Sequence, residues 1–241
     1  MSSPSTARSR LSSARTVAGP SLGAVVDRAP PAHEDRIIRR RDDPVTPVGG
    51  IAVLTGNLAP GGAVIKHSAA SPALQCHEGR AVVFDSVADM ALRLDDEATG
   101  IAPDDVLVLR NAGPRGAPGM PEAGYIPIPV PLARRGVKDM VRISDARMSG
   151  TAFGTVILHV SPEAAAGGPI AAVRTGDRIR LHVPARRLEL LVDSAELERR
   201  LAGLAPPDAA PARGYAGLYD RHVLQADEGA DFDFLKAAGD D

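Results

Sequence analysis

The residues best suited to chemistry fall in two loop segments of the sequence. Ser149 lies in the run Ser144-Asp-Ala-Arg-Met-Ser-Gly-Thr151, which directly follows an apolar stretch in the sequence. Glu122 lies 27 residues earlier, at the end of the glycine-rich run Gly113–Glu122. A serine hydroxyl acts as a nucleophile or base when its surroundings lower its pKa, and a carboxylate suits a hard cation such as Mg²⁺. The residue types permit this chemistry at the two positions, but composition and spacing by themselves do not assign it.

Each of these loops also has a simpler interpretation. The glycine-rich run can bring backbone N–H groups close to an anion, but it fits neither the Walker A pattern nor the dinucleotide fingerprint, so a tight loop stays an alternative. A serine before glycine is typical of turns. The nucleophile-elbow pattern is absent because Arg147 stands where its first glycine belongs. We expect Asp145 and Arg147 to pair and stiffen the Ser149 loop.

The cysteine and histidine residues do not suggest a metal centre. Cys76 is the only cysteine, so the chain can form no internal disulfide and cannot supply the four or so ligands of an iron–sulfur cluster. The spacing of His67, Cys76 and His77 matches no zinc pattern, which favours structural or surface roles. His159 and His182 lie in predicted strands and are interpreted as ordinary strand residues.

Composition limits the classes of function. The chain has 241 residues, 44% of them hydrophobic but only 3% aromatic, so its core must consist of Ala, Val, Leu and Ile. A formal net charge of −2 argues against nucleic-acid or anionic-membrane partners. No apolar stretch approaches the ~20 residues of a membrane span. With one cysteine and no secretory signal, we expect a cytoplasmic protein.

The chain divides into three predicted regions. Residues 1–48 are rich in serine and proline and are expected to be a mostly disordered leader and linker. The first fifteen residues resemble a transit peptide faintly, and a disordered leader or a non-native start codon are the alternatives. Residues 49–205 form the predicted domain, and residues 206–241 a C-terminal tail that packs on it.

The pattern within the domain favours strands. Apolar or alternating runs predict strands at residues 51–54, 63–65, 81–84, 106–109, 140–143, 155–160, 178–183 and 188–192. Helices are predicted after Ser86, after Ser161, and after Asp193, where Glu196 stands in capping-box register. There is no regular βαβ alternation. The predicted fold class is therefore α/β but rich in β, a compact barrel-like domain with a few flanking helices.

Taken together, these motifs resemble one known family. The resemblance is nearly continuous from Thr16 to Leu235, and it is carried, beside the two loops, by the runs Gly50–Pro60, Gly79–Phe84, His159–Ala164 and Val173–Asp177. The chain resembles the C-terminal domain of the dihydroxy-acid and phosphogluconate dehydratases. Ser144-Asp-Ala-Arg-Met-Ser149 and the ending His222–Asp227 are more similar to the sugar-acid (arabinonate and xylonate) branch.

The resemblance implies a reaction and its cofactors. Members of the family convert 2,3-dihydroxy acids into 2-keto-3-deoxy acids. By this resemblance, Glu122 is a Mg²⁺ ligand, Ser149 as an alkoxide removes the C2 proton, and Thr151 binds a substrate oxygen. Mg²⁺ holds the substrate carboxylate and C2 hydroxyl, and a [2Fe–2S] cluster takes the departing C3 hydroxyl. The complete enzymes are expected to be oligomers.

The chain departs from the family in one respect. In the family, the cluster cysteines and the other Mg²⁺ ligands belong to a larger N-terminal domain, and nothing similar precedes Thr16. We therefore expect the chain to be inactive alone and to need an N-terminal half as its partner. The alternatives are a non-catalytic binding module, a gene fragment, or an unrelated hydrolase that uses Ser149.

Overall fold

The structure is a computed structural model, and it describes residues 12–30, 37, 39, 42–150, 153–205 and 213–235. The chain divides into two compact units, Met1–Val48 and Gly49–Asp241. In the first unit, helix α2 (Leu22–Arg28) begins after Ser21, whose hydroxyl accepts a hydrogen bond from the N–H of Ala24. The disorder predicted for residues 1–48 falls partly outside the described residues and stays a prediction.

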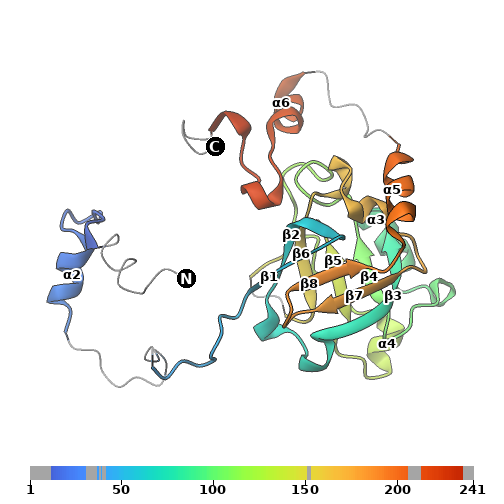
Figure 1. The fold of residues 1–241 in the computed structure, drawn as a ribbon, viewed down its shortest axis with the longest axis horizontal. Helices are drawn as coiled ribbons and strands as arrows, with labels where there is room; N and C mark the ends of the chain where they lie inside the picture. Colours follow the sequence, from blue (N-terminus) through green and yellow to red (C-terminus); the bar gives the residue numbers. More distant parts are fainter. Residues whose placement is uncertain are drawn as a thin grey trace. The chain divides into compact units, whose positions relative to one another are not determined.

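The second unit is a closed barrel of mixed strands (Figure 1), which confirms the predicted fold class. Around the barrel the order is β1-β2-β6-β5-β4-β3-β7-β8. The strands are β1 (Ala52–Gly56), β2 (Ala59–Ile65), β3 (Cys76–Phe84), β4 (Val106–Leu109), β5 (Val141–Ser144), β6 (Val156–Ser161), β7 (Arg178–His182) and β8 (Arg187–Leu190). Every predicted strand is present, although β2 and β3 begin several residues earlier than the apolar runs indicate.

Short helices connect and flank the strands. The α-helices of this unit are α3 (Val87–Arg93), α4 (Val130–Arg134), α5 (Ser194–Ala202) and α6 (Gly214–His222). The 3₁₀ helices are η1 (His67–Ala69), η2 (Pro72–Leu74), η3 (Glu97–Thr99), η4 (Ala164–Ala166), η5 (Pro169–Ala172), η6 (Ala226–Glu228) and η7 (Asp233–Leu235). No helix in the described ranges is long and apolar enough to cross a bilayer.

The predicted helix starts are largely confirmed. Ser86 caps α3 by accepting from the N–H of Asp89, and Asp193 caps α5 by accepting from Ala195. The predicted capping box is replaced by a simple cap, because Asp193 accepts from the N–H of Ala195 and not from that of Glu196, whose carboxylate pairs with Arg200 at 2.7 Å. The predicted helix after Ser161 is the single 3₁₀ turn η4. Helix α6 lies in the predicted tail, for which the sequence pattern indicated no helix.

Two apolar layers explain why the middle strands are apolar on both faces. Strands β3, β4, β5 and β6 pair in parallel, and alternate residues of each point to opposite faces. Val83, Val106 and Val108 belong to the core inside the barrel, whereas Phe84 and Leu109 belong to a second core, outside the barrel beneath α3 and α4. Both layers are almost entirely aliphatic, as the composition requires.

The barrel closes at a narrow seam between β1 and β8. The two strands share a single residue pair, Thr55 with Arg187. Beside it, the Asn57 side chain donates to the carbonyl of Leu190 and accepts from its N–H, both at 2.8 Å. Gly56 allows this approach, since a Cβ there would lie 1.9 Å from the Leu188 carbonyl oxygen. One amide side chain thus completes the strand pairing.

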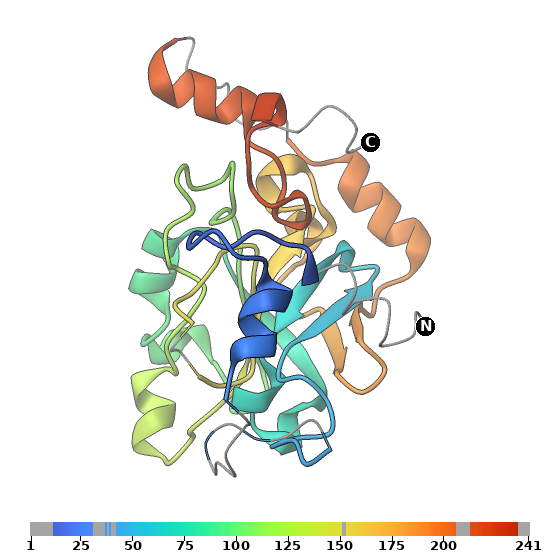
Figure 2. The same ribbon diagram turned by 90° about the vertical axis from the view of Figure 1, so that its left-hand side faces the viewer.

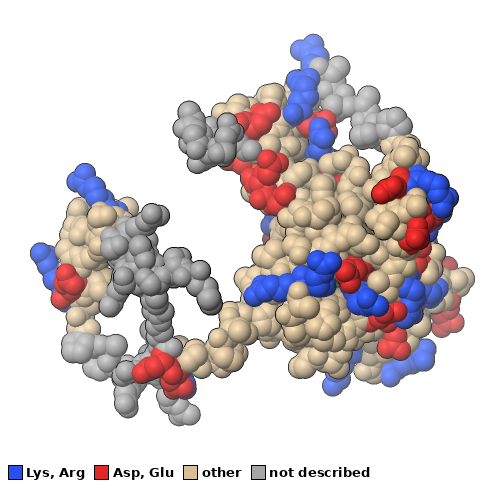
Figure 3. All heavy atoms as spheres, viewed as in Figure 1, with Lys and Arg blue, Asp and Glu red and all other residues tan. Residues whose placement is uncertain are grey.

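Charged side chains alternate in sign on the face formed by β7, β8 and the start of β3 (Figure 3). The Glu78 carboxylate accepts from Arg178 and Arg180, each at 3.2 Å. Glu189 pairs with Arg187 at 2.9 Å. Each of these pairs is solvent-exposed and contributes little by itself, but together they leave this face without an extended region of one charge.

Replacing Asn57 by alanine is expected to lower the free energy of unfolding by about 1–3 kcal/mol, because it leaves the N–H and carbonyl of Leu190 without their partner at the seam. Urea unfolding of both proteins measures the change. The matched control is Gln75→Ala, which removes one side-chain bond to the His67 carbonyl away from the seam. Equal losses in the two variants would contradict a special role for Asn57.

Candidate active site

The candidate site lies where the parallel strands end. Strands β3, β4 and β5 run in the same direction, so their carboxyl ends meet at one end of the barrel. Polar residues follow each strand directly: Asp85 after β3, Asn111 shortly after β4, and Asp145 after β5. In open α/β sheets, ligands bind outside this same edge. The mixed barrel therefore brings polar groups from distant parts of the sequence to one place.

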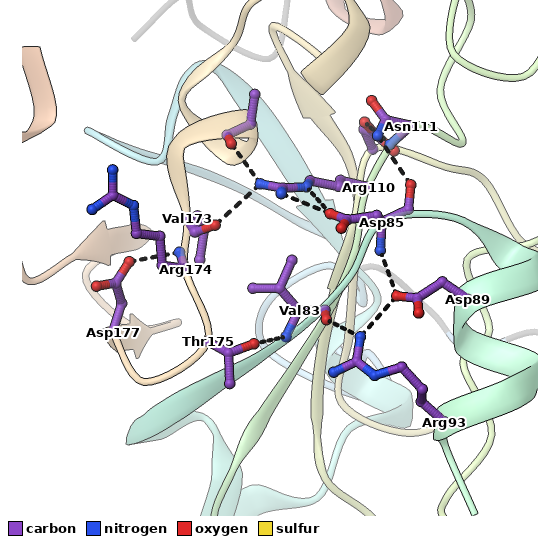
Figure 4. Close-up of polar contacts among 12 residues, drawn as sticks. Val83, Asp85, Asp89, Arg93, Arg110, Asn111, Val173, Arg174, Thr175 and Asp177 are labelled. Atoms are coloured by element: carbon purple, nitrogen blue, oxygen red, sulfur yellow. Dashed lines mark hydrogen bonds and ion pairs between the residues drawn. The ribbon is translucent and has the colours of Figure 1, made fainter. Parts of the chain in front are cut away.

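A polar network fixes the ends of β3 and β4 (Figure 4). The Arg110 guanidinium donates to the Asp85 carboxylate at 2.7 Å and to the carbonyl of Val173 at 3.1 Å. The Asn111 side chain donates to the carbonyl of Asp85 at 3.0 Å. These bonds join two strand ends to the segment after η5, so the loop that follows Asn111 starts from a fixed point.

Asp145 fixes the start of the loop that follows Asn111 by accepting hydrogen bonds from its backbone. Its side chain is fully buried and accepts from the N–H groups of Asn111, Ala112 and Ala164 at 3.0–3.1 Å. Burial, and after it the nearby charge of Glu163, outweigh these three hydrogen bonds and raise the pKa of Asp145 to about 6. Asp145 thus links the end of β5 to two other segments.

The glycine-rich loop wraps around a second buried carboxylate, that of Glu163. The N–H of Arg115 donates to Oε1 at 2.9 Å and the N–H of Gly116 to Oε2 at 3.0 Å. A Cβ on Gly113 would lie 2.6 Å from Oε2, and one on Gly116 would lie 2.8 Å from the Cα of Asn111. The loop does present N–H groups to an anion, as its composition suggests, but that anion is the chain's own glutamate.

Arg147 joins the two loops that the sequence singles out. Its guanidinium donates to the carboxylate of Glu122 at 2.9 Å and to the carbonyl of Met120 at 2.6 Å. Its own carbonyl accepts from the N–H of Gly124 at 2.8 Å. The expected pair between Asp145 and Arg147 is therefore wrong: Asp145 is used by backbone N–H groups, and Arg147 reaches across to the other loop.

Ser149 follows in the same loop and is partly buried. Lys66, just after the end of β2, donates to the carbonyl of Gly150 at 3.1 Å. Lys66 thus contacts the residue after Ser149, and Arg147 lies two residues before it in the chain. Thr151, the expected substrate-binding residue, lies outside the described residues.

A buried arginine on the outer face of the barrel supports this arrangement. Arg142 of β5 donates to the carbonyls of Tyr125 and Ile126 at 3.2 and 3.1 Å and pairs with Asp139 at 2.9 Å. Burial alone would raise the pKa of Asp139, but hydrogen bonds from Thr155 and Ser71 outweigh it and lower that pKa. Arg142 therefore holds the segment that follows Glu122.

His159 differs from the ordinary strand residue that the sequence indicates. It lies in β6 as predicted, but its φ of 53° is in the left-handed region, which is unusual for a residue other than glycine. It lines a cavity of about 400 Å³ together with Gly61, Val64 and Asp227. Burial, and after it the charge of Arg147, lower the pKa of His159. It is therefore a neutral group beside the Arg147 loop at neutral pH.

The described residues do not by themselves form a Mg²⁺ or iron–sulfur site. Among them, no three His, Cys, Asp or Glu side chains gather around one point. The Glu122 side chain is 50% exposed and pairs with Arg147. The one carboxylate that it offers to a metal ion is therefore already paired with a guanidinium group. Cys76 is exposed, and His67 and His77 contact the backbone carbonyls of Gly49 and Asp104.

The chain is similar to known proteins over most of its length. Residues 36–230 match the family described as dihydroxy-acid/6-phosphogluconate dehydratase, C-terminal. The chain belongs to this family. The match covers most of the barrel unit, including both loops that Arg147 joins. It confirms the resemblance of the sequence to the C-terminal domain of the dehydratases.

Individual dehydratases are similar over most of the chain. Identity is 56% to L-arabonate dehydratase of Azospirillum brasilense, over 92% of the chain and 39% of that protein. It is 51% to L-arabinonate dehydratase of Rhizobium leguminosarum bv. trifolii, over 92% and 38%, and 41% to dihydroxy-acid dehydratase of Dehalococcoides mccartyi strain CBDB1, over 91% and 39%. The chain thus spans less than two fifths of the length of these relatives.

Asp145 gives a test of the site's electrostatics. A carboxyl whose pKa rises on folding, here from 3.8 to about 6, stabilises the fold while protonated, and this stabilisation is lost as the pH rises through 6. Relative to Asp145→Asn, which cannot ionise, the unfolding free energy of the native chain is expected to fall by at most about 3 kcal/mol between pH 4 and 7. Urea unfolding across this range measures it.

The control for this comparison is Asp104→Asn, which makes the same substitution at an exposed turn. A ¹³C NMR titration of the Asp145 carboxyl provides a direct reading. A titration midpoint near 4 would contradict the electrostatic account.

Proposed function

We propose that the chain is the C-terminal domain of an enzyme that dehydrates 2,3-dihydroxy sugar acids to 2-keto-3-deoxy acids. Its membership of the dehydratase family supports this, as does its higher identity to the arabonate and arabinonate enzymes than to the dihydroxy-acid enzyme. The observation that carries the proposal is the bridge by Arg147, which holds the loop of Glu122 against the loop of Ser149.

In this proposal Ser149 removes the proton from C2 of the substrate. A serine hydroxyl is too weak an acid to be ionised near pH 7, so positive charges nearby must favour the alkoxide. Two cations are available: Lys66 donates to the Ser149 loop at Gly150, and Arg147 belongs to that loop. Thr151, two residues further along, is assigned a contact to a substrate oxygen.

The proposed cofactors need residues from elsewhere. We assign Glu122 as one ligand of a Mg²⁺ ion, and the other ligands and the whole [2Fe–2S] cluster to an N-terminal domain. When bound, Mg²⁺ would supply positive charge for the substrate carboxylate. Glu122 has to exchange or share its partner Arg147 to take this role. The N-terminal domain is the proposed partner, either as a separate polypeptide or as part of a longer protein.

We also propose a cytoplasmic location and an oligomeric complete enzyme. The one exposed cysteine suits a reducing compartment. The barrel unit leaves apolar side chains uncovered on the outer face of β1 and just before it, such as Ile51 and Val53 at 62% and 51% exposure. Such surfaces favour contact with another domain or subunit.

The 241-residue chain alone is expected to show no dehydration of pentonates such as L-arabinonate, even after iron–sulfur reconstitution with Mg²⁺ present. Activity is expected when it is co-expressed with the N-terminal domain of a dehydratase such as that of Azospirillum brasilense. Formation of the 2-keto-3-deoxy acid, followed by a colorimetric assay for the product, measures both.

In the assembled enzyme, Ser149→Ala should reduce kcat about 100-fold or more while circular dichroism stays unchanged. The control Ser194→Ala, at the exposed start of α5, should retain full activity. Dehydration of the substrate by the chain alone would contradict the assignment of the cluster and the other Mg²⁺ ligands to an N-terminal domain. An assembled but inactive native enzyme would favour the non-catalytic binding module.

A further inference from the structure

The C-terminal tail, residues 213–235, contacts the same buried glutamate that holds the glycine-rich loop. The Gln225 amide donates from Nε2 to the Glu163 Oε1 at 2.9 Å, and its Oε1 accepts from the backbone N–H of Glu163 at 2.9 Å. This reciprocal pair joins positions 62 residues apart in sequence. One side chain of the tail therefore satisfies both the backbone and the carboxylate of Glu163.

Two further contacts hold the tail in register with the barrel end. The Ser161 hydroxyl donates to the Asp227 carboxylate at 2.6 Å, and the Arg115 guanidinium donates to the carbonyl of Asp220 at 3.3 Å. Figure 2 shows the tail and the glycine-rich loop at the same end of the barrel. The tail thus contacts the loop directly through Arg115 and indirectly through Glu163.

The hydrogen bonds of Glu163 leave little freedom in this arrangement. Its side chain is 1% exposed, and its two oxygens accept from Gln225, from the N–H of Arg115 and from the N–H of Gly116. A buried carboxylate that loses a donor has no water to replace it. Loss of the Gln225 side chain would therefore weaken the hydrogen bonds by which Glu163 orders the loop.

We propose that Gln225 and Glu163 are positioning residues that fix the glycine-rich loop, and through it Glu122, opposite the Ser149 loop. The tail is then part of the candidate active site without contacting substrate. The role assigned to Glu122 rests on the proposed function, whereas the ordering of the loop does not. The two can be tested apart.

The test exchanges the two side chains. In Glu163→Gln alone, one amide N–H₂ must face another donor, either a loop N–H or the Gln225 amide. In Gln225→Glu alone, two carboxylates face each other in a buried place. In the double variant, Gln at 163 can accept from Arg115 and Gly116 and donate to Glu at 225, whose other oxygen accepts from the backbone N–H of residue 163. The swap restores the pair between positions 163 and 225 at unchanged net charge. It keeps the bonds from the N–H groups of Arg115 and Gly116 to the position of Oε2, at 3.1 and 3.0 Å, and gives up only the second bond of Arg115, to the position of Oε1.

Amide hydrogen exchange followed by NMR reads the loop directly. Each single variant should speed exchange at Arg115 and Gly116 by about tenfold or more, and should also speed it at Gly124, whose N–H joins the loop to Arg147. The double variant should return to within about threefold of the native chain, since interacting residues are non-additive. Amides of β4 should not change. The matched control is Gln75→Glu, at the other glutamine.

Unchanged exchange at Arg115 and Gly116 in the single variants would overturn the proposal, as would single variants that loosen the loop without rescue by the double. Single variants that fail to fold, beside a double variant that folds, support it. In enzyme assembled with an N-terminal domain, the single variants should lower kcat and the double restore it. If the double variant restores the native exchange rates but the native chain assembled with an N-terminal domain is inactive, the positioning role stands and the proposed function is contradicted.

Discussion

Two buried carboxylates and the backbone N–H groups that they accept determine the shape of the candidate site. Asp145 and Glu163 together accept from residues 111, 112, 115, 116 and 164. The glycine-rich loop satisfies only some of its own N–H groups, such as those of Ala117 and Met120, and a buried carboxylate without donors is strongly destabilising. Each therefore requires the other, and the path of the loop follows from where the two strands place these carboxylates.

The barrel provides the rigid frame for this arrangement. Its parallel strands are covered on both faces, inside by the barrel core and outside by α3 and α4. An interior of eight strands is just wide enough for side chains to fill, and branched aliphatic residues fill it here without any tryptophan. From the strand ends that this packing supports, hydrogen bonds then hold three polar side chains, Asp85, Asn111 and Asp145, at the edge.

The sequence predicts those features that depend on neighbouring residues, and fails where the partner is distant. Apolar runs such as Val106–Leu109 predict the strands because burial on both faces leaves a local pattern. Ser86 predicts the start of α3 because a cap bonds to an N–H only three residues further on, that of Asp89. The role of Glu163 has no local signal, since its donors come from residues 115, 116 and 225. The Asp145–Arg147 pair was expected from proximity in sequence, but both side chains have partners in other segments.

The positions of Ser149 and Glu122 come from the family resemblance, not from spacing. A serine before glycine and a glutamate after a loop occur in many proteins. What the structure adds is the link between them through Arg147. A derivation from residue types alone would have had no reason to place these loops in contact.

The seam at Asn57 has a consequence for how the protein is made. Within the barrel, β1 is synthesised first and β8 last, so β1 has one edge unpaired until β8 follows. An unpaired strand edge next to exposed apolar residues such as Ile51 and Val53 is a template for association with other chains. In the interval before β8 follows, the nascent chain therefore presents an edge at which it can associate with other chains.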